Sequence, residues 1–537
     1  MIARLELIGM EWSREWVARE HDRLLRSCYT LFEEGHYQEG LRLAWAFSAM
    51  CQETRSHWRT WEKVVDVQAD LAKAARDPVA QGRAMLDGAE LCANQGDHDQ
   101  GMTYARRARW VFGRVDADEV WHARAHRALG INLREQGHLD AALREFDAAA
   151  QVFARHDRWW WARVQTHKAE ILAYIRPPEE RVGLLRSVAR AFDELGDTDR
   201  RDFARVLLAE ALGEEGYALR AWLTLQDLHE SFVRKGWDWY VARCLRAMGE
   251  LDSQVLVEQY ELCDLVLNPN RARELRNAVR SDVARETNDS GLLSDETELL
   301  AVRRQVRQRY QARIQDLLGA YADQARQEVR KGGSPIQRHG TAQAGDWSVR
   351  GRTMLLERAL AMFDQMGDPR SANEIRLALG RVLVAERGTK EAATVFKRAV
   401  RGFEGLGNHW RKARAQRVMV TELFEELMAK NLARGVPLPP RMAGRLMRQL
   451  RDHAQDAFET YSELDNHMGR LRAQVLLARV LWARMADQAE VRGHLDQAEE
   501  VAHEHGEERI VEEVRRWRRM FFVDHPGHIA RQWPIHG

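Results

Sequence analysis

Residues 121–149 read WHARAHRALGINLREQGHLDAALREFDAA, and this stretch decides the fold. Small residues stand at Gly130 and Ala142, and the larger Leu133 and Phe146 follow them. Small residues allow two helices to approach closely, and the larger ones fill the space beside the contact. Gly137 separates the two segments at a point where helices commonly end with a positive φ angle. The stretch therefore predicts two antiparallel helices joined by a short turn.

The same pattern returns along the chain with a period of about 40 residues, which lies in the range of helical repeats. The residues in the place of Gly130 are small or apolar, and they recur at nearly equal intervals: Ala89, Gly130, Ala169, Ala209 and Gly249. Further on, Gly380 and Val420 are separated by the same interval. Such a regular period is typical of helix pairs that stack and bury their apolar faces against one another.

These residues resemble the tetratricopeptide signature, which has a small residue at position 8 of its first helix, a turn glycine, and Ala, Phe and Ala on its second helix. The resemblance covers about residues 20–265 and 350–510. The usual tetratricopeptide period is about 34 residues, so this chain is more similar to the long repeats of kinesin light chains and large bacterial regulators. The resemblance implies an all-α fold, a right-handed superhelical solenoid in two arrays.

The repeat register is interrupted between Gly249 and Gly380, which are a little over three periods apart. We expect an N-terminal array at 1–265, an irregular helical insert at 266–349, and a C-terminal array with a capping tail at 350–537. In the insert, Ser294 is placed to cap a long helix, and residues 332–346 are expected to form an exposed loop. The region is either an enlarged repeat or a hinge between the arrays.

Composition favours a soluble cytoplasmic protein. The 537 residues include 82 Lys and Arg and 81 Asp and Glu, a formal net charge of +1, so no overall field attracts nucleic acid or anionic lipid. No apolar run reaches the roughly 18 residues of a membrane span, and the first residues lack a signal-peptide pattern. The odd number of cysteines and the absence of a CxxC pair argue against a disulfide framework: Cys28, Cys51, Cys92, Cys244 and Cys263.

Signatures of known catalytic chemistry are missing, including the P-loop, HExxH, the nucleophile elbow and the dinucleotide fingerprint. We therefore expect no enzymatic activity, no cofactor and no metal site. His503 and His505 would point to different faces of a helix, which disfavours shared metal coordination. The basic run Arg303–Arg309 overlaps an apolar stripe formed by Val306, Tyr310, Ile314 and Leu317. This stripe places the arginines on a solvated face, with phosphate contact as the alternative.

The resemblance also implies where a partner would bind. In tetratricopeptide proteins, positions 2, 5, 9, 12 and 13 of the first helix line a concave groove. Transferred by register, the groove holds a series of arginines: Arg83, Arg124, Arg127, Arg134, Arg163, Arg243 and Arg246. Guanidinium groups suit bidentate capture of carboxylates, as in an acidic peptide or an extended tail of a partner. Alternatively, these arginines pair with glutamates of neighbouring helices.

The sequence thus predicts a non-enzymatic scaffold or sensor that binds a protein or peptide partner in its groove. One alternative is a peptide- or ligand-responsive regulatory receptor that controls transcription or an effector. Another is nucleic-acid binding through the basic run in the middle of the chain. Trp159, Trp160 and Trp161 cannot all face one core, so they serve either a repeat junction or, through one exposed ring, partner binding.

Overall fold

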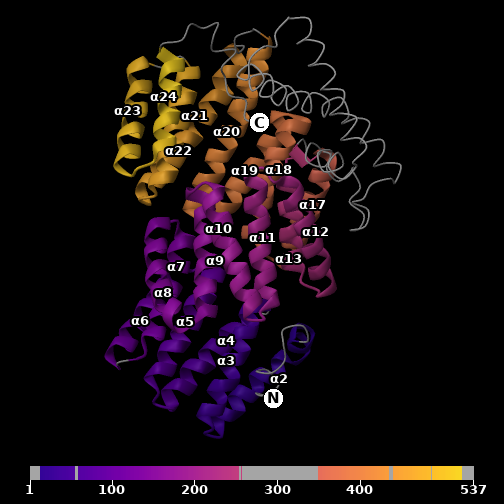
Figure 1. Ribbon diagram of the computed structural model, residues 1–537, viewed down its shortest axis with the longest axis vertical. Coiled ribbons are helices and arrows are strands. Elements are labelled where there is room, and N and C mark those ends of the chain that lie inside the picture. The colour runs from indigo at the N-terminus through magenta and orange to yellow at the C-terminus, as the bar shows by residue number, and fades with distance from the viewer. Residues whose placement is uncertain are drawn as a thin grey trace, which may run out of the picture. The chain divides into compact units, whose positions relative to one another are not determined.

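The computed structural model describes residues 13–54, 58–115, 117–252, 255–256, 349–434, 440–484 and 487–522. Every regular element in these ranges is an α-helix, and consecutive helices form antiparallel pairs that stack along the chain (Figure 1). The prediction of an all-α solenoid with tetratricopeptide-like repeats is confirmed. No helix in the described ranges is both long enough and apolar enough to cross a membrane.

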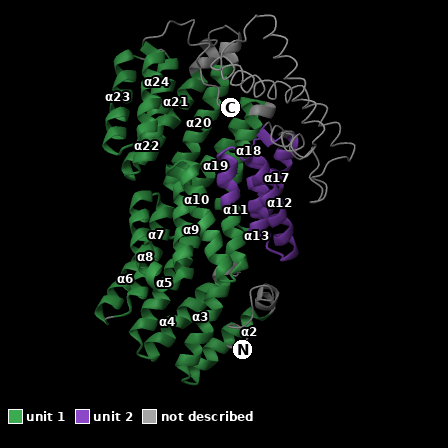
Figure 2. Cartoon of the chain, in the orientation of Figure 1, with its two compact units in different colours: residues 1–207, 367–537 green, residues 208–366 purple. Residues whose placement is uncertain are grey.

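The chain forms two compact units, residues 1–207 with 367–537 and residues 208–366 (Figure 2). The first unit holds α2 (Ser13–Glu33), α3 (Tyr37–Thr54), α4 (Trp58–Ala74), α5 (Pro78–Gln95), α6 (His98–Arg114), α7 (Glu119–Gln136), α8 (Leu139–His156), α9 (Arg158–Ile175), α10 (Pro178–Glu194), α18 (Pro369–Arg387), α19 (Thr389–Gly405), α20 (His409–Arg434), α21 (Pro440–Glu463), α22 (His467–Ala483), α23 (Gln488–Glu504) and α24 (Glu508–Phe522). The second unit holds α12 (Ala218–Arg234), α13 (Asp238–Glu250) and α17 (Val349–Met366), while α11 (Thr198–Glu214) crosses the boundary.

Local signals set the ends of the helices. At the start of α5, the Asp77 side chain accepts a hydrogen bond from the Ala80 N–H at 2.9 Å, and Pro78 occupies the first turn, where its missing N–H costs nothing. At the end of α7, Gly137 has φ 91°, a left-handed conformation that favours glycine. The turn predicted at Gly137 is confirmed.

The small residues of the repeat sit where the two helices of a pair meet. A Cβ atom added to Gly130 of α7 would lie 2.8 Å from the Phe146 ring of α8, which is closer than real Cβ contacts. Gly380 of α18 faces Phe396 of α19 in the same way. The predicted close approach at Gly130 and Phe146 is therefore confirmed, and it explains why the repeat keeps a small residue opposite a large one.

This contact gives a paired test of packing. Gly130→Ala should lower the free energy of unfolding by about 1 to 3 kcal/mol, because the new methyl group overpacks the Phe146 ring. Gly183→Ala in α10 should instead raise it by about 0.5 to 1 kcal/mol, since nothing lies within 4 Å of that site and alanine favours the helix. Urea unfolding of the two variants measures both effects, and equal shifts would contradict the packing argument.

The second unit explains the interrupted register. α13 packs against α17, and a Cβ atom at Gly249 would lie 2.7 Å from the Leu356 side chain, which is the contact seen at Gly130. Without residues 257–348, Gly249 and Gly380 would stand about one period apart. α13 and α17 therefore form an enlarged repeat with the intervening sequence between its two helices.

The three-segment division of the chain remains a prediction. Its insert, 266–349, lies outside the described residues except for Val349, and so do the predicted cap at Ser294, the basic run Arg303–Arg309 and the loop 332–346. Cys263 lies outside them as well. The four described cysteines are buried free thiols, as expected of core residues: Cys28, Cys51, Cys92 and Cys244.

Within the first unit, side chains near the starts of α20 and α22 cap the ends of α7 and α9. The Trp410 indole N–H donates to the Glu135 carbonyl at 2.8 Å, and the Arg472 guanidinium donates to the Tyr174 carbonyl at 2.7 Å. The last carbonyls of a helix have no partner inside that helix. The C-terminal helices of the unit therefore complete the hydrogen bonding of the N-terminal ones.

A buried carboxylate lies where the C-terminal helices of the first unit contact the end of α7. Glu135 is 2% exposed and pairs with Arg134 at 2.7 Å, Arg370 at 2.9 Å and Arg411 at 3.2 Å. These arginines come from α7, α18 and α20, so one side chain of α7 joins this helix to two helices more than 200 residues further along the chain. We name Glu135, Arg134, Arg370 and Arg411 the Glu135 cluster.

Candidate partner-binding face

Three of the predicted groove arginines occupy equivalent places on successive helices. Arg83 of α5, Arg124 of α7 and Arg163 of α9 each precede the small register residue of their repeat by six positions. Because Ala89, Gly130 and Ala169 are all small, each of these helices can approach the second helix of its pair to a similar distance. One guanidinium group per repeat is therefore presented on the same face of the stack.

Tryptophan rings alternate with these arginines. The Arg83 guanidinium carbon lies 3.8 Å from the ring centre of Trp45 and 5.8 Å from that of Trp121. The Arg124 carbon lies 4.6 Å from Trp121 and 4.4 Å from Trp160.

The Arg163 carbon lies 5.3 Å from the Trp160 ring centre and 5.2 Å from that of Trp159, so the alternation continues into α9. All of these distances fall within cation–π range. We name Trp45, Arg83, Trp121, Arg124, Trp160 and Arg163 the arginine–tryptophan row.

Two arginines of the row lack a close counter-charge. Among the described residues, Arg83 and Arg124 have no carboxylate within 4 Å. Burial lowers the pKa of Arg83, and the nearby Asp87 opposes that shift. Burial, followed by the positive charge of Arg83, lowers the pKa of Arg124 to about 10. Both groups stay charged at neutral pH, so the row presents positive charge that its surroundings only partly neutralise.

The other groove arginines of the first unit are held in ion pairs. Arg127 is 2% exposed and bonds the Glu90 carboxylate, and Arg134 bonds both Glu170 and Glu135. Their internal pairing is the alternative that the sequence left open. A role for them in partner binding stays a prediction.

His167 lies between Arg127 and Arg134. Its Nε2 is 3.4 Å from Arg127, and its Nδ1 is 3.4 Å from the Glu170 carboxylate. Burial lowers the pKa of His167 to about 4, so the ring is neutral at neutral pH. A neutral ring can accept from Arg127 at Nε2 while it donates from Nδ1 to Glu170. His167 thus holds Arg127 directly, and it holds Arg134 through the Glu170 carboxylate that both side chains contact.

In the second unit, Arg243 donates two hydrogen bonds to Glu210, each 3.0 Å long. Arg246 approaches Glu210 at 3.5 Å and Glu250 at 3.3 Å. These two arginines also have internal partners, and their role in binding stays a prediction.

Trp45 and Trp121 were not predicted as site residues, whereas Trp160 belongs to the run for which the sequence left partner binding open as an alternative. Trp121 stands three residues before Arg124, and Trp160 three residues before Arg163, so each pair shares one side of its helix. This Trp-x-x-Arg spacing in two consecutive repeats is the signal that would have found them. Trp45 has no arginine three residues later in the sequence, so this spacing would not have identified it.

The three consecutive tryptophans have different surroundings, and each is partly buried. Trp159 donates its indole N–H to Asp197 at 2.7 Å and packs with Trp161 against Ala162 and its neighbours. Trp160 instead lies in the row. The run therefore serves both the repeat junction and the candidate face.

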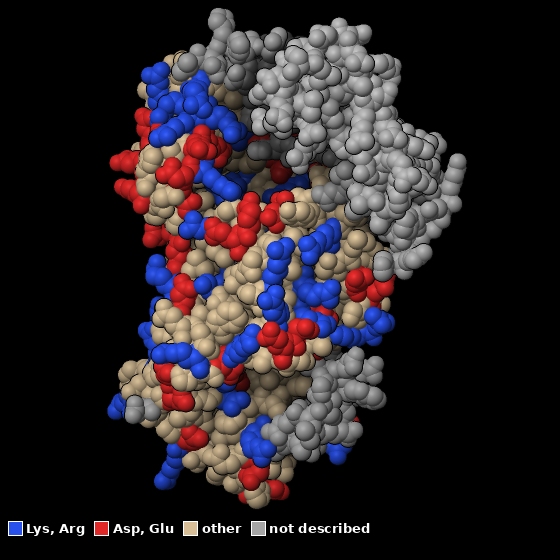
Figure 3. All heavy atoms as spheres, in the orientation of Figure 1, with Lys and Arg blue, Asp and Glu red and all other residues tan. Residues whose placement is uncertain are grey.

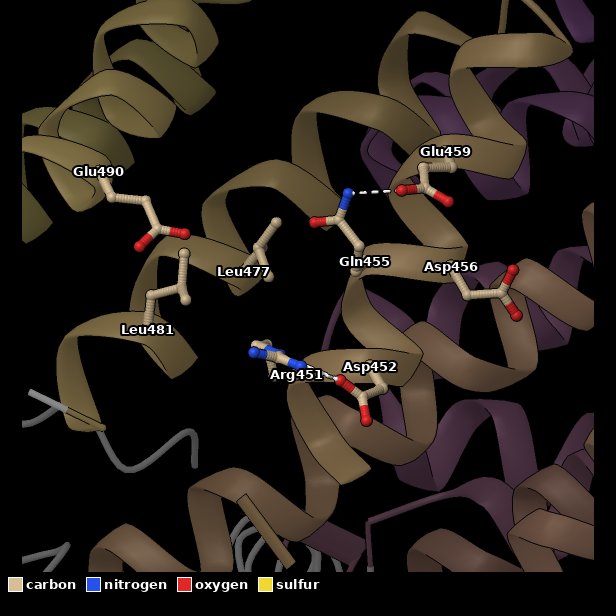
Figure 4. A pocket seen from close by; sticks show the side chains of 8 residues that line it. All are labelled: Arg451, Asp452, Gln455, Asp456, Glu459, Leu477, Leu481 and Glu490. Atoms are coloured by element: carbon tan, nitrogen blue, oxygen red, sulfur yellow. Dashed lines mark hydrogen bonds and ion pairs between the residues drawn. The ribbon is translucent and has the colours of Figure 1, made fainter. Parts of the chain in front are cut away.

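A second candidate is a pocket of about 370 Å³ in the C-terminal part of the first unit (Figure 4). Its lining is rich in carboxylates: Arg451, Asp452, Gln455, Asp456, Glu459, Leu477, Leu481 and Glu490. Arg451 pairs with Asp452 at 2.6 Å, and Gln455 donates to Glu459 at 2.7 Å. Since these four groups pair with one another and Asp456 pairs with Lys412 at 3.3 Å, we assign the pocket no ligand.

No group of three metal-ligating side chains occurs within the ranges that the structure describes. His503 contacts Arg515 at 3.3 Å, which is an ordinary surface contact. Figure 3 shows charges of both signs interspersed over the visible face, without a large area of one sign.

Comparison with known proteins identifies no family. No protein-family model matches the chain, and neither does any curated protein. Many solved structures match the chain at very low identity, and three of them are described below.

A Rap protein complexed with competence and sporulation factor is 9% identical, with 89% of this chain and 99% of that chain covered and a TM-score of 0.40. The Rap conjugation gene regulator of plasmid pLS20, in complex with the Phr* peptide, is 10% identical over 72% and 96%, with a TM-score of 0.36.

A signal transduction ATPase with a tetratricopeptide repeat sensor, from Pyrococcus horikoshii, is 10% identical, with a TM-score of 0.35. It matches 86% of this chain and 55% of its own length. With TM-scores below 0.5, these similarities carry no argument about what this chain binds.

Proposed function

We propose that this protein is a non-enzymatic scaffold or sensor that binds an acidic protein or peptide along the arginine–tryptophan row. The observation that carries this proposal is the incomplete neutralisation of Arg83 and Arg124, which lie between indole rings and form no ion pair within 4 Å among the described residues, although the more distant Asp87 partly offsets their charge. Arginine and tryptophan are also the residues most enriched at the energetic centres of protein interfaces.

The chemistry of the row favours carboxylates. A cation–π contact uses the face of the guanidinium group and leaves its N–H groups available for hydrogen bonds. A carboxylate can accept two of these bonds, and its charge offsets the repulsion between neighbouring arginines. The proposal places the protein in the cytoplasm, where the four described cysteines would stay reduced as they are in the structure.

The test is affinity capture of partners from the native cell by tagged full-length protein, followed by mass spectrometry. A partner should be recovered with wild type and at least about tenfold less with Arg124→Glu, since reversing one central charge removes a charge-assisted hydrogen bond and adds repulsion. Arg107→Glu is the matched control, because Arg107 is exposed on the neighbouring helix α6 and lies outside the row.

Equal recovery with Arg124→Glu and wild type would remove the row from the binding site. Capture of nucleic acid in place of protein would favour the basic middle segment. Circular dichroism and urea unfolding must show that Arg124→Glu is folded, because Arg124 is partly buried.

A further inference from the structure

The outer side of α6 is basic and carries an exposed aromatic ring. Its exposed arginines form no ion pair within 4 Å among the described residues: Arg106, Arg107, Arg109 and Arg114. Trp110 lies among them and is 62% exposed, the largest exposed fraction of the described large hydrophobic side chains. The Arg114 guanidinium carbon lies 4.8 Å from the Trp110 ring centre. Arginine and tryptophan exposed side by side are typical of a surface that binds another protein.

The outer side of α4 is acidic. Glu62, Asp66 and Asp70 recur every four residues, so they share one side of the helix, and all three are exposed. None of them forms an ion pair within 4 Å among the described residues, although Glu62 accepts a hydrogen bond from the Gln95 side chain. Partial burial, and then the charges of Asp70 and Glu62, raise the pKa of Asp66, so these carboxylates repel one another.

The acidic and basic sides occupy the same place in the repeat. Asp66 and Arg106 are 40 residues apart, and so are Asp70 and Trp110, which is the period of the repeat. α4 and α6 are each antiparallel to α5, so they run in the same direction (Figure 1). The second helices of stacked pairs form one layer, and the first helices, which carry the arginine–tryptophan row, form the other. The two charged sides therefore lie next to each other, at the same level along their helices, on the side of the unit away from the row.

We propose that α4 and α6 form an interface between two copies of this chain, related by a two-fold axis. An axis that runs between these helices and parallel to both places α6 of each copy against α4 of the other. Rotation about this axis keeps each residue at its level along the helix. Asp66 of one copy then faces Arg106 of the other, and Asp70 faces Trp110, whose indole N–H can donate to a carboxylate. Each contact occurs twice, as in the isologous dimers that are the most common symmetric assemblies.

Charge complementarity selects a second copy as the occupant of this surface. An unrelated acidic partner would neutralise α6 but leave the carboxylates of α4 unpaired, whereas a second copy pairs both sides at once. Exposed ion pairs contribute little by themselves, so Trp110 provides most of the binding energy and the charges fix the orientation. The dimer leaves the arginine–tryptophan row accessible, because the row lies in the other layer of helices.

Sedimentation velocity of the full-length protein measures the association. We expect a dimer at low ionic strength whose dissociation constant rises with salt, because salt screens exposed charges. Arg106→Asp and Asp66→Arg should each weaken the dimer at least about tenfold, since each variant places like charges opposite one another at both symmetric contacts. Trp110→Ala should weaken it by a similar factor through lost contact area. The control is Arg186→Asp, which changes an exposed arginine of α10 outside the interface and should leave the dissociation constant unchanged.

Mixing the two charge variants tests the pairing itself. Arg106→Asp carries an acidic group at both facing positions, and Asp66→Arg carries a basic group at both. An equimolar mixture should therefore form a dimer with nearly the wild-type affinity, although neither variant forms one alone. The double variant Arg106→Asp/Asp66→Arg should also regain the dimer, because it exchanges the two charges.

Three results would overturn the proposal. Wild type stays monomeric at low ionic strength up to about 100 µM, neither charge variant weakens the dimer, or the mixture of the variants fails to restore it. If wild type is monomeric and Arg106→Asp instead removes an acidic protein or a nucleic acid from the affinity capture, α6 binds that partner and not a second copy. None of these results bears on the row, whose test uses Arg124→Glu.

Discussion

Glu135→Gln should lower the free energy of unfolding by about 3 to 5 kcal/mol, because it breaks a buried ion-pair cluster and leaves arginines without their shared partner. Glutamine keeps the shape of the side chain, so the loss measures the charge. Glu135 is the centre of the Glu135 cluster and is almost fully buried. Urea unfolding followed by circular dichroism gives the value, with the exposed Glu500→Gln as a control that should shift it by less than about 0.5 kcal/mol.

The pH dependence checks the cause of this loss. Burial alone would raise the pKa of Glu135, but Arg370, Arg134 and Arg411 outweigh burial and hold it well below the usual range. A carboxyl group with a depressed folded-state pKa stabilises the fold above its unfolded pKa, about 4.3 for glutamate, and loses that contribution as pH falls.

The stability difference between wild type and Glu135→Gln should therefore be constant above about pH 5 and shrink at lower pH. Thermal unfolding of both proteins over this range measures it. A difference that stays the same down to about pH 3 would show that the loss comes from packing and not from the charge of Glu135.

Trp410→Ala should cost about 3 to 5 kcal/mol, the usual loss for a large aromatic side chain removed from a core. Trp410 is 2% exposed, covers Gly137 and meets the Tyr174 ring edge-on at 5.2 Å between ring centres. Its indole also caps the Glu135 carbonyl. The variant therefore leaves both a cavity and an unsatisfied buried carbonyl.

The matched control is Trp110→Ala. Trp110 is 62% exposed on α6, so its removal should change the free energy of unfolding by less than about 0.5 kcal/mol. Trp410→Phe should recover part of the loss, since it fills most of the space but cannot donate to the Glu135 carbonyl. If Trp410→Ala were as stable as Trp110→Ala, α20 would not be held against α7 by this contact.

The repeats could be predicted because their cause is local. Gly130 packs against a large side chain of the next helix. Phe146 provides that side chain at a sequence distance set by the short turn at Gly137. The Glu135 cluster could not be predicted in this way. Arg370 and Arg411 lie 235 and 276 residues from Glu135, and no periodicity relates them.

The candidate site was predicted in part, for a similar reason. Register placed Arg83, Arg124 and Arg163 on one face, because they share a position in the repeat. Position in the repeat could not distinguish these arginines from Arg127, which forms an ion pair with Glu90 of the preceding repeat. That distinction depends on which side chains meet across helices.

The enlarged repeat has a consequence for synthesis on the ribosome. Most of the helices that the structure describes are followed after a few residues by the helix they pair with, but residues 251–348 separate the end of α13 from the start of α17. At about 5 to 20 residues per second, α13 emerges about 5 to 20 seconds before α17 has begun to be made. During that interval, Trp239 lacks its contact with Phe363 of α17. The surface at Gly249 also lacks the Leu356 side chain that covers it in the folded protein. A nascent chain arrested in this interval should therefore be the form of the protein that chaperones bind most readily.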